Sequence, residues 1–164
     1  MVQRTFSAIG GPAARSVLVS LILLGLLVRR RPRSAALLLT ATGGMGIINT
    51  SIKELVRRQR PEVLPGFKQA GGYSFPSGHS SGSLVFFGAV GYLIWHLTRH
   101  RVVATTAFSL GSVLTGLVGR SRVSLRAHHG SDVLAGYALG ALWLGLVLKL
   151  FAGPLAAESR GARR

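Results

Sequence analysis

The apolar residues of this chain are grouped in five long blocks, and the connectors between the blocks are short and rich in arginine, glycine and proline. By length alone the 164 residues could form one soluble domain, but such blocks are what a bilayer requires, at about 20 apolar residues per spanning helix. The pattern predicts an all-α fold, a polytopic membrane bundle of about five transmembrane helices in a single domain over residues 1–164. The expected spans are Ser16–Val28, Ser34–Ile52, Leu84–Leu97, Val102–Val118 and Asp132–Phe151.

Both ends of the chain are more polar than these blocks. We expect residues 1–15 to be a short leader and residues 152–164 to be a basic, polar, frayed tail. The first block is short for a span unless Ile9–Ala14 lengthen it. A signal peptide would share its basic start and apolar core, but Arg29–Arg33 follow directly, without a small-residue cleavage pattern. Such a cluster is typical of the cytoplasmic end of a membrane helix.

The chain is strongly basic, with 20 Lys and Arg against 4 Asp and Glu and a formal net charge of +16. In a soluble protein this balance would indicate a nucleic-acid partner. Here the basic residues gather at the ends of the apolar blocks, where anionic lipid headgroups lie. We therefore expect the bilayer to be a partner and nucleic acid not to be one.

The acidic residues and cysteines limit the possible metal chemistry. Glu54, Glu62, Asp132 and Glu158 are scattered along the chain, so a carboxylate-bridged two-metal centre is hard to build. The chain has no cysteine, which removes cysteine-based zinc sites from consideration. We expect no metal and no cofactor.

Five spans place the connectors on alternate sides of the membrane. The connectors at residues 53–73 and 119–131 then share one face, and the remaining basic turns share the other. If the charges of the first pair serve function, the second group marks the cytoplasm, and the active face is extracytoplasmic.

Within the second apolar block, we interpret Gly43, Gly44 and Gly46 as helix-packing residues.

The stretch from Ser121 to Asp132, S-R-V-S-L-R-A-H-H-G-S-D, contains the strongest chemical signal. Asp132, the only aspartate, lies four residues after His128, so a helix that begins near Gly130 would let the carboxylate reach the imidazole. A carboxylate in that place fixes the tautomer of the ring and supports charge on it. Because Arg122 offers donors suited to phosphate oxygens, the stretch predicts a histidine nucleophile in an anion site.

A second segment, residues 76–80, has the proline, hydroxyl side chains and glycine of a helix start. The free N–H groups and positive dipole end of such a start favour bound phosphate. A third segment, in the connector at residues 53–73, carries several cations. On the predicted topology all three segments lie on one membrane face.

Together the three segments resemble the tripartite signature of the type 2 phosphatidic acid phosphatase (PAP2) superfamily of membrane lipid phosphatases. The match covers residue type, internal spacing and order between Lys53 and Asp132. Its three parts are Lys53-(six residues)-Arg60-Pro61, then Pro76-Ser77-Gly78-His79, then Ser121-Arg122-(five residues)-His128-(three residues)-Asp132.

The resemblance implies a role for each matched position. His128 would be the nucleophile that forms a transient phosphohistidine, and Asp132 would orient it. His79 would protonate the leaving group and later activate water. The residues implied to bind the substrate phosphate are Lys53, Arg60, Ser77, Gly78 and Arg122.

The implied activity is metal-independent hydrolysis of a lipid phosphate or diphosphate. Candidate substrates are phosphatidic acid, phosphatidylglycerol phosphate, diacylglycerol pyrophosphate, polyprenyl diphosphates and polyprenyl-linked sugar phosphates such as decaprenylphosphoryl-5-phosphoribose. The excess of arginine over lysine hints at a GC-rich coding sequence and favours the inner membrane of a bacterium, where a role in cell-wall synthesis would fit.

Other interpretations stay open on the sequence. Membrane enzymes of the superfamily commonly have six spans, so either the first is dispensable here or the chain starts late relative to its relatives. A non-catalytic lipid-phosphate binding or transport module would need only the cations, not the histidines. A soluble vanadate-dependent haloperoxidase shares the anion pocket but not the apolar spans. Zinc held by His79, His128 and Asp132 would be repelled by the nearby cations.

Overall fold

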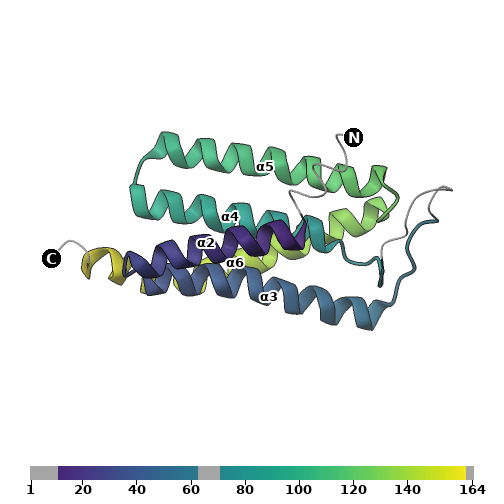
Figure 1. Cartoon of the computed structure of the whole chain (residues 1–164), viewed down its shortest axis with the longest axis horizontal. Coiled ribbons are helices and arrows are strands. Elements are labelled where there is room, and N and C mark those ends of the chain that lie inside the picture. The colour runs from purple at the N-terminus through teal and green to yellow at the C-terminus, as the bar shows by residue number, and fades with distance from the viewer. Residues whose placement is uncertain (1–10, 63–70, 162–164) are drawn as a thin grey trace.

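The computed structural model describes residues 11–62 and 71–161, and within these ranges the regular secondary structure consists of helices. They run roughly along one long axis and form a bundle (Figure 1). The all-α helical bundle that the hydrophobic blocks predicted is confirmed. The helices are α2 (Pro12–Val28), α3 (Pro32–Val56), α4 (Gly78–Thr98), α5 (Arg101–Ser124) and α6 (Gly130–Gly161).

Four of the described helices are long and apolar enough to cross a membrane: α3, α4, α5 and α6 as far as Leu155. The first helix, α2, has 17 residues and is shorter than these candidates. Many large apolar side chains on the outside of the bundle are exposed, Leu142 and Leu134 among them. An outward-facing apolar surface of this kind suits contact with lipid rather than water.

The ends of the chain differ from the sequence-based expectation. α2 already begins at Pro12, so the last four residues of the expected leader are helical. α6 continues through Gly161 instead of ending at Phe151, so the expected frayed tail is wrong for residues 152–161. The helix persists because Glu158 is buried against the start of α3. The rest of the leader (1–10), the end of the tail (162–164) and residues 63–70 of the connector lie outside the described residues.

The helices begin and end at residues that suit those positions. Pro12 and Pro32 each occupy the first turn of a helix, where a missing N–H costs nothing. Ser77 caps α4 by accepting a hydrogen bond from the backbone N–H of Ser80. Arg57 and Arg99 end α3 and α4 in the left-handed conformation, with φ of 50° and 59°. The helix start predicted at residues 76–80 is therefore confirmed.

Helices α4 and α6 approach each other closely where α6 carries glycine. A Cβ on Gly136 would lie 2.8 Å from the carbonyl oxygen of Ser77, and one on Gly140 would lie 3.0 Å from that of Ser81. Two glycines one turn apart let the backbones of membrane helices meet. This contact places the start of α6, with Asp132, beside the start of α4, and the backbone N–H of Ser77 donates to the carbonyl oxygen of Asp132 at 2.9 Å.

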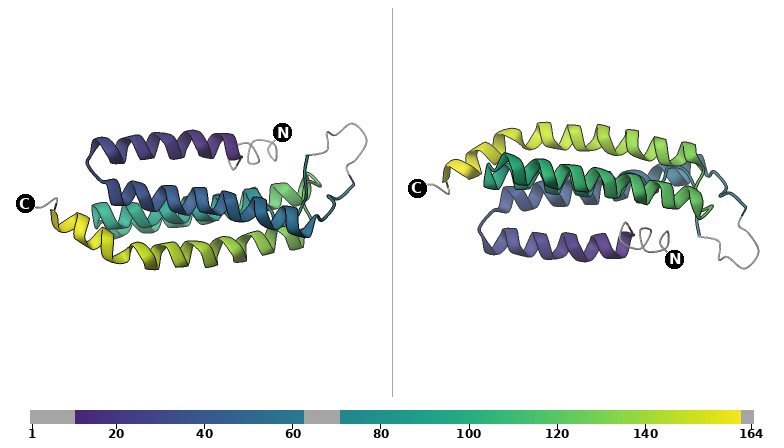
Figure 2. Two further views of the ribbon diagram at one scale, coloured as in Figure 1. Left: turned by 90° about the horizontal axis from the view of Figure 1, so that it is seen from below. Right: turned by 90° about the horizontal axis from the view of Figure 1, so that it is seen from above.

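The three glycines of α3 have different surroundings. Gly44 faces the ring of Trp143 on α6, and the indole N–H of Trp143 donates to the carbonyl oxygen of Ala41. For Gly44 the packing interpretation is correct. For Gly43 and Gly46 it is wrong, because no neighbouring atom lies within 4 Å of where their Cβ atoms would be. They instead line a cavity between α3 and α2, which lies on the outer side of the bundle (Figure 2).

Candidate active site

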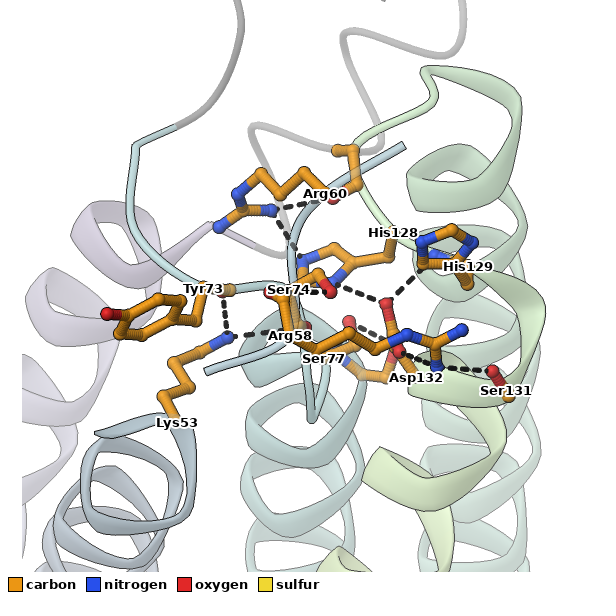
Figure 3. A network of polar contacts seen from close by, with 12 residues as sticks. Lys53, Arg58, Arg60, Tyr73, Ser74, Ser77, His128, His129, Ser131 and Asp132 are labelled. Atoms are coloured by element: carbon orange, nitrogen blue, oxygen red, sulfur yellow. Dashed lines mark hydrogen bonds and ion pairs between the residues drawn. The ribbon is translucent and has the colours of Figure 1, made fainter. Parts of the chain in front are cut away.

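The three sequence motifs meet at one end of the bundle. The end of α3, the start of α4, the end of α5 and the start of α6 all lie there, together with the segments that follow α3 and precede α6 (Figure 1). Segments far apart in the chain thus contribute side chains to one polar network, which Figure 3 shows from close by. The alternating topology predicted that these connectors would lie together at one end of the helices.

His128 and Asp132 form the centre of this network. α6 begins at Gly130, as anticipated, and the Nδ1 atom of His128 lies 3.6 Å from Oδ2 of Asp132. The backbone of His128 is held by α5, since its N–H donates to the carbonyl oxygen of Arg122 at 3.2 Å. Arg126, two residues earlier, adopts a left-handed φ of 50° as the chain turns back from α5. His128 and Asp132 are both buried.

Asp132 is fully buried, and besides His128 two further groups contact its carboxylate. Oδ2 accepts a hydrogen bond from the backbone N–H of His129 at 2.9 Å, and Oδ1 is 2.8 Å from Nη1 of Arg58. The same Arg58 atom also donates to the hydroxyl of Ser131. A buried carboxylate needs such donors because its oxygens have lost their hydrogen bonds to water. Arg58 is not among the site residues predicted from the sequence; the one signal was a lone aspartate in a strongly basic chain.

Arg60 determines which nitrogen of His128 carries the ring proton. Its Nη1 atom lies 3.3 Å from Nε2 of His128 and also donates to the carbonyl oxygen of Ala127. Its other nitrogens donate to the carbonyl oxygens of Gly71 and Gly72. Because a guanidinium can only donate, Nε2 is the acceptor, and the ring proton belongs on Nδ1, toward Asp132.

Burial and positive neighbours keep His128 neutral. They lower the pKa of its imidazole from 6.5 to about 4, burial being the largest cause and the charges of Arg60, Lys53 and Arg122 adding to it. Burial also lowers the pKa of the Arg60 guanidinium, while the charge of Asp132 acts in the opposite direction. At neutral pH the ring therefore has an unprotonated nitrogen beside several cations, as a nucleophile toward an anion requires.

Five of the predicted site residues line a single cavity of about 480 Å³: Lys53, Arg60, Gly78, His79 and His128. The other three lie behind its wall. Ser77 is buried, and its hydroxyl caps α4 and accepts from the Ser80 hydroxyl. Asp132 and Arg122 are likewise buried, next to His128.

The ammonium of Lys53 also organises the loop before α4. Its Nζ atom donates to the carbonyl oxygens of Tyr73 and Ser74, at 2.7 and 3.3 Å. Ser74 in turn donates from its backbone N–H and its hydroxyl to the carbonyl oxygen of Arg58. The cation at the end of α3 thus ties the loop that leads into Gly78 and His79 to the segment that carries Arg58 and Arg60 (Figure 3).

Over residues 11–62 and 71–161, no group of three or more His, Asp or Glu side chains is placed to hold a metal ion. The zinc alternative built on His79, His128 and Asp132 therefore finds no ligand set there. What the site does present is a neutral histidine backed by a buried carboxylate, with a second histidine and several cations on the same cavity. This is the donor set of an enzyme that transfers a phosphoryl group.

Comparison with known proteins agrees with this class. Residues 34–154 match the model of the PAP2 superfamily. The chain is 33% identical over 141 residues to phosphatidylglycerophosphatase B of Bacillus subtilis (strain 168), covering 82% of this chain and 68% of that protein. It is 33% identical over 121 residues to lipid A 1-phosphatase of Rhizobium etli, covering 68% of this chain and 47% of that protein.

The fold is shared as well. The crystal structure of a transmembrane PAP2-type phosphatidylglycerolphosphate phosphatase from Bacillus subtilis matches with a TM-score of 0.83 at 29% identity, covering 91% of this chain and 74% of that one. This chain belongs to the PAP2 superfamily, as its three motifs indicated. Its relatives are lipid phosphatases, so the expected enzyme class is confirmed, and the chain is an integral membrane protein.

Proposed function

We propose that this protein is a metal-independent phosphatase that removes a terminal phosphate from a membrane lipid through a phosphohistidine on His128. The observation that carries the proposal is the environment of His128. Its Nε2 atom faces the cavity beside Arg60, while its Nδ1 atom faces the buried carboxylate of Asp132. A lipid-binding module would need the cations alone and would have no use for this orientation of the ring.

In the first step, the Nε2 electron pair of His128 attacks phosphorus, and the bond from phosphorus to the lipid oxygen breaks. His79, on the same cavity, gives a proton to the departing oxygen. His128 becomes positively charged as it bonds to phosphorus, and the carboxylate of Asp132 stabilises that charge. Lys53 and Arg60 contact the phosphoryl oxygens, where charge develops.

In the second step, water attacks the phosphorus atom and the P–N bond breaks. His79 accepts a proton from that water, which returns the residue to its starting state. The electron pair of the broken bond returns to Nε2, and inorganic phosphate leaves. Histidine suits both roles because its ring can donate a proton when it is protonated and accept one when it is neutral.

The substrate is a lipid because the cavity continues from the histidines into the apolar part of the bundle. It reaches Val19 on α2 and Thr42 on α3, while Lys53 and Arg60 stand at its polar end. A phosphate at the polar end would thus have its apolar chain between α2 and α3. Phosphatidylglycerol phosphate, phosphatidic acid, diacylglycerol pyrophosphate and polyprenyl diphosphates all have this form, and we place the reaction at the extracytoplasmic face of a bacterial inner membrane.

The proposal is tested by measuring phosphate release from a panel of these lipids by the purified protein in detergent, with EDTA present. We expect release that persists in EDTA and falls on the order of 10⁴-fold in His128→Ala. Reactions with lipid carrying ³²P in its terminal phosphate, quenched in alkaline detergent because the P–N bond of phosphohistidine is labile in acid, should leave label on the wild-type protein and none on His128→Ala.

Two outcomes would reject the proposal. Full activity in His128→Ala would remove the nucleophile. Absence of release from every lipid, combined with saturable binding of those lipids, would favour the non-catalytic module. Exposed Arg120 on α5 provides the control, since Arg120→Gln removes a charge at the same end of the bundle and should leave the rate within about twofold.

A further inference from the structure

A cation outside the three motifs also lines the cavity. Arg15, assigned from the sequence to the leader, lies in the first turn of α2, and its guanidinium reaches the start of α4. It donates to the carbonyl oxygens of Gly78 and His79, with separations of 3.4 and 3.2 Å. Gly82 leaves space for it, because a Cβ at that position would lie 2.5 Å from the guanidinium.

These contacts place Arg15 between His128 and the apolar end of the cavity. His128 and Arg60 lie in the segments beyond the helix ends, whereas Gly82 is one turn inside α4 from Gly78. The cavity extends further along α3, from Lys53 to Thr42, which corresponds to about 16 Å of helix. A lipid whose terminal phosphate met His128 would therefore pass Arg15 before its chain reached the apolar part.

A guanidinium at this position favours a second anion. Its planar array of N–H donors matches the oxygens of phosphate, and a partly buried cation interacts with an anion more strongly than an exposed one does. In a lipid diphosphate, or in a lipid with a phosphodiester next to its terminal phosphate, a second phosphate lies on the chain side of the bond that breaks. In phosphatidic acid, that position is occupied by uncharged glycerol ester groups.

We propose that Arg15 binds this second phosphate and so selects lipids that carry two phosphates over lipids that carry one. The inference rests on the proposed function and narrows its substrate class. It assigns to α2, the helix that contributes none of the motif residues, a part in substrate choice.

The test compares lipids that differ in the second phosphate. Diacylglycerol pyrophosphate and phosphatidic acid with identical acyl chains form one matched pair, and phosphatidylglycerol phosphate provides a second two-phosphate lipid. Initial rates of phosphate release, at equal surface fraction in detergent micelles, give kcat/KM for each. The quantity of interest is the ratio of kcat/KM for a two-phosphate lipid to that for phosphatidic acid.

In Arg15→Gln we expect this ratio to fall about tenfold or more for at least one two-phosphate lipid, because a charge-assisted contact to phosphate is lost. Gly82→Ala displaces the guanidinium without removing it and should lower the same ratio, so it serves as a second test if Arg15→Gln does not fold. In Arg120→Gln, which removes an exposed charge that does not line the cavity, the ratio should stay within about twofold.

The inference would be overturned if Arg15→Gln lost activity equally on all three lipids or kept the wild-type ratio of kcat/KM. It would also be overturned if Arg120→Gln lowered that ratio as much as Arg15→Gln does. These outcomes are separate from failure of the proposed function, which would appear as phosphate release that survives in His128→Ala.

Discussion

The bundle has a buried carboxylate at each end, and the two differ in what they contact. Asp132, at the site end, lies against Arg58 and His128. Glu158, at the opposite end, accepts hydrogen bonds from the backbone N–H of Arg33 at 2.7 Å and from the hydroxyl of Ser34. Each carboxylate thus joins two segments of the bundle that are distant in the chain.

The difference shows how a buried carboxylate can serve two purposes. Glu158 satisfies free N–H groups at the start of α3, which is the task of a helix cap, here performed by a side chain of α6. Asp132 also accepts a backbone N–H, but its remaining contacts are a histidine on a cavity and a guanidinium. A carboxylate whose hydrogen bonds go to a helix start stabilises the fold, whereas one placed beside a histidine that lines the cavity also acts on chemistry.

Asp132→Asn should have the largest effect of the tests that separate the two ends. We expect kcat/KM for lipid phosphate to fall on the order of 10³-fold, because an amide cannot stabilise the charge that develops on His128 and can favour the wrong tautomer. Steady-state kinetics in detergent measure this. The variant should elute from a size-exclusion column as the wild type does. A fall in kcat/KM smaller than tenfold in such a variant would show that Asp132 is not coupled to the ring of His128.

Arg58→Gln should change the titration of His128. Arg58 now offsets the charge of Asp132, so its removal leaves the carboxylate free to favour the protonated ring, and the pKa of His128 should rise from about 4 toward 6.5. NMR of ¹⁵N-histidine-labelled protein, with His128 assigned through His128→Asn, follows the titration directly. A pKa that stays unchanged or falls would contradict this arrangement.

The wild-type pKa also has a consequence for stability. A folded value of about 4 lies below the ordinary 6.5, so the unfolded chain binds a proton first as pH falls. The contribution of His128 to stability is therefore present in full above pH 6.5 and is lost between 6.5 and about 4. Thermal unfolding of wild type in detergent should show a steeper loss over this window than His128→Asn does.

Glu158→Gln should have the smallest effect on activity and a measurable effect on stability. Loss of the charge weakens the hydrogen bonds to α3, which we expect to cost about 1–3 kcal/mol, while kcat/KM stays within about threefold. Thermal unfolding together with kinetics separates the two quantities. Glu54→Gln, at an exposed position of α3, is the matched control and should alter neither stability nor kcat/KM. A large fall of kcat/KM in Glu158→Gln would remove the distinction between the two ends of the bundle.

Much of this protein was determined by the sequence alone. The apolar blocks predicted the helices, since a bilayer requires internally hydrogen-bonded segments of limited length. The spacing of His128 and Asp132 predicted their contact, because four residues at a helix start bring two side chains together. Motif order and spacing indicated the family before any comparison.

The contacts between groups that are distant in the chain depend on tertiary packing. Arg58 and Asp132 are 74 positions apart, and Arg15 and His79 are 64 apart. No local pattern reports such pairs, because they depend on how α2, α3 and α6 pack. The same holds for Gly43 and Gly46, which a small-residue pattern cannot distinguish from Gly44, and for residues 152–161, where burial of Glu158 outweighs a polar composition. Local periodicity determines a helix, but packing determines what its side chains face.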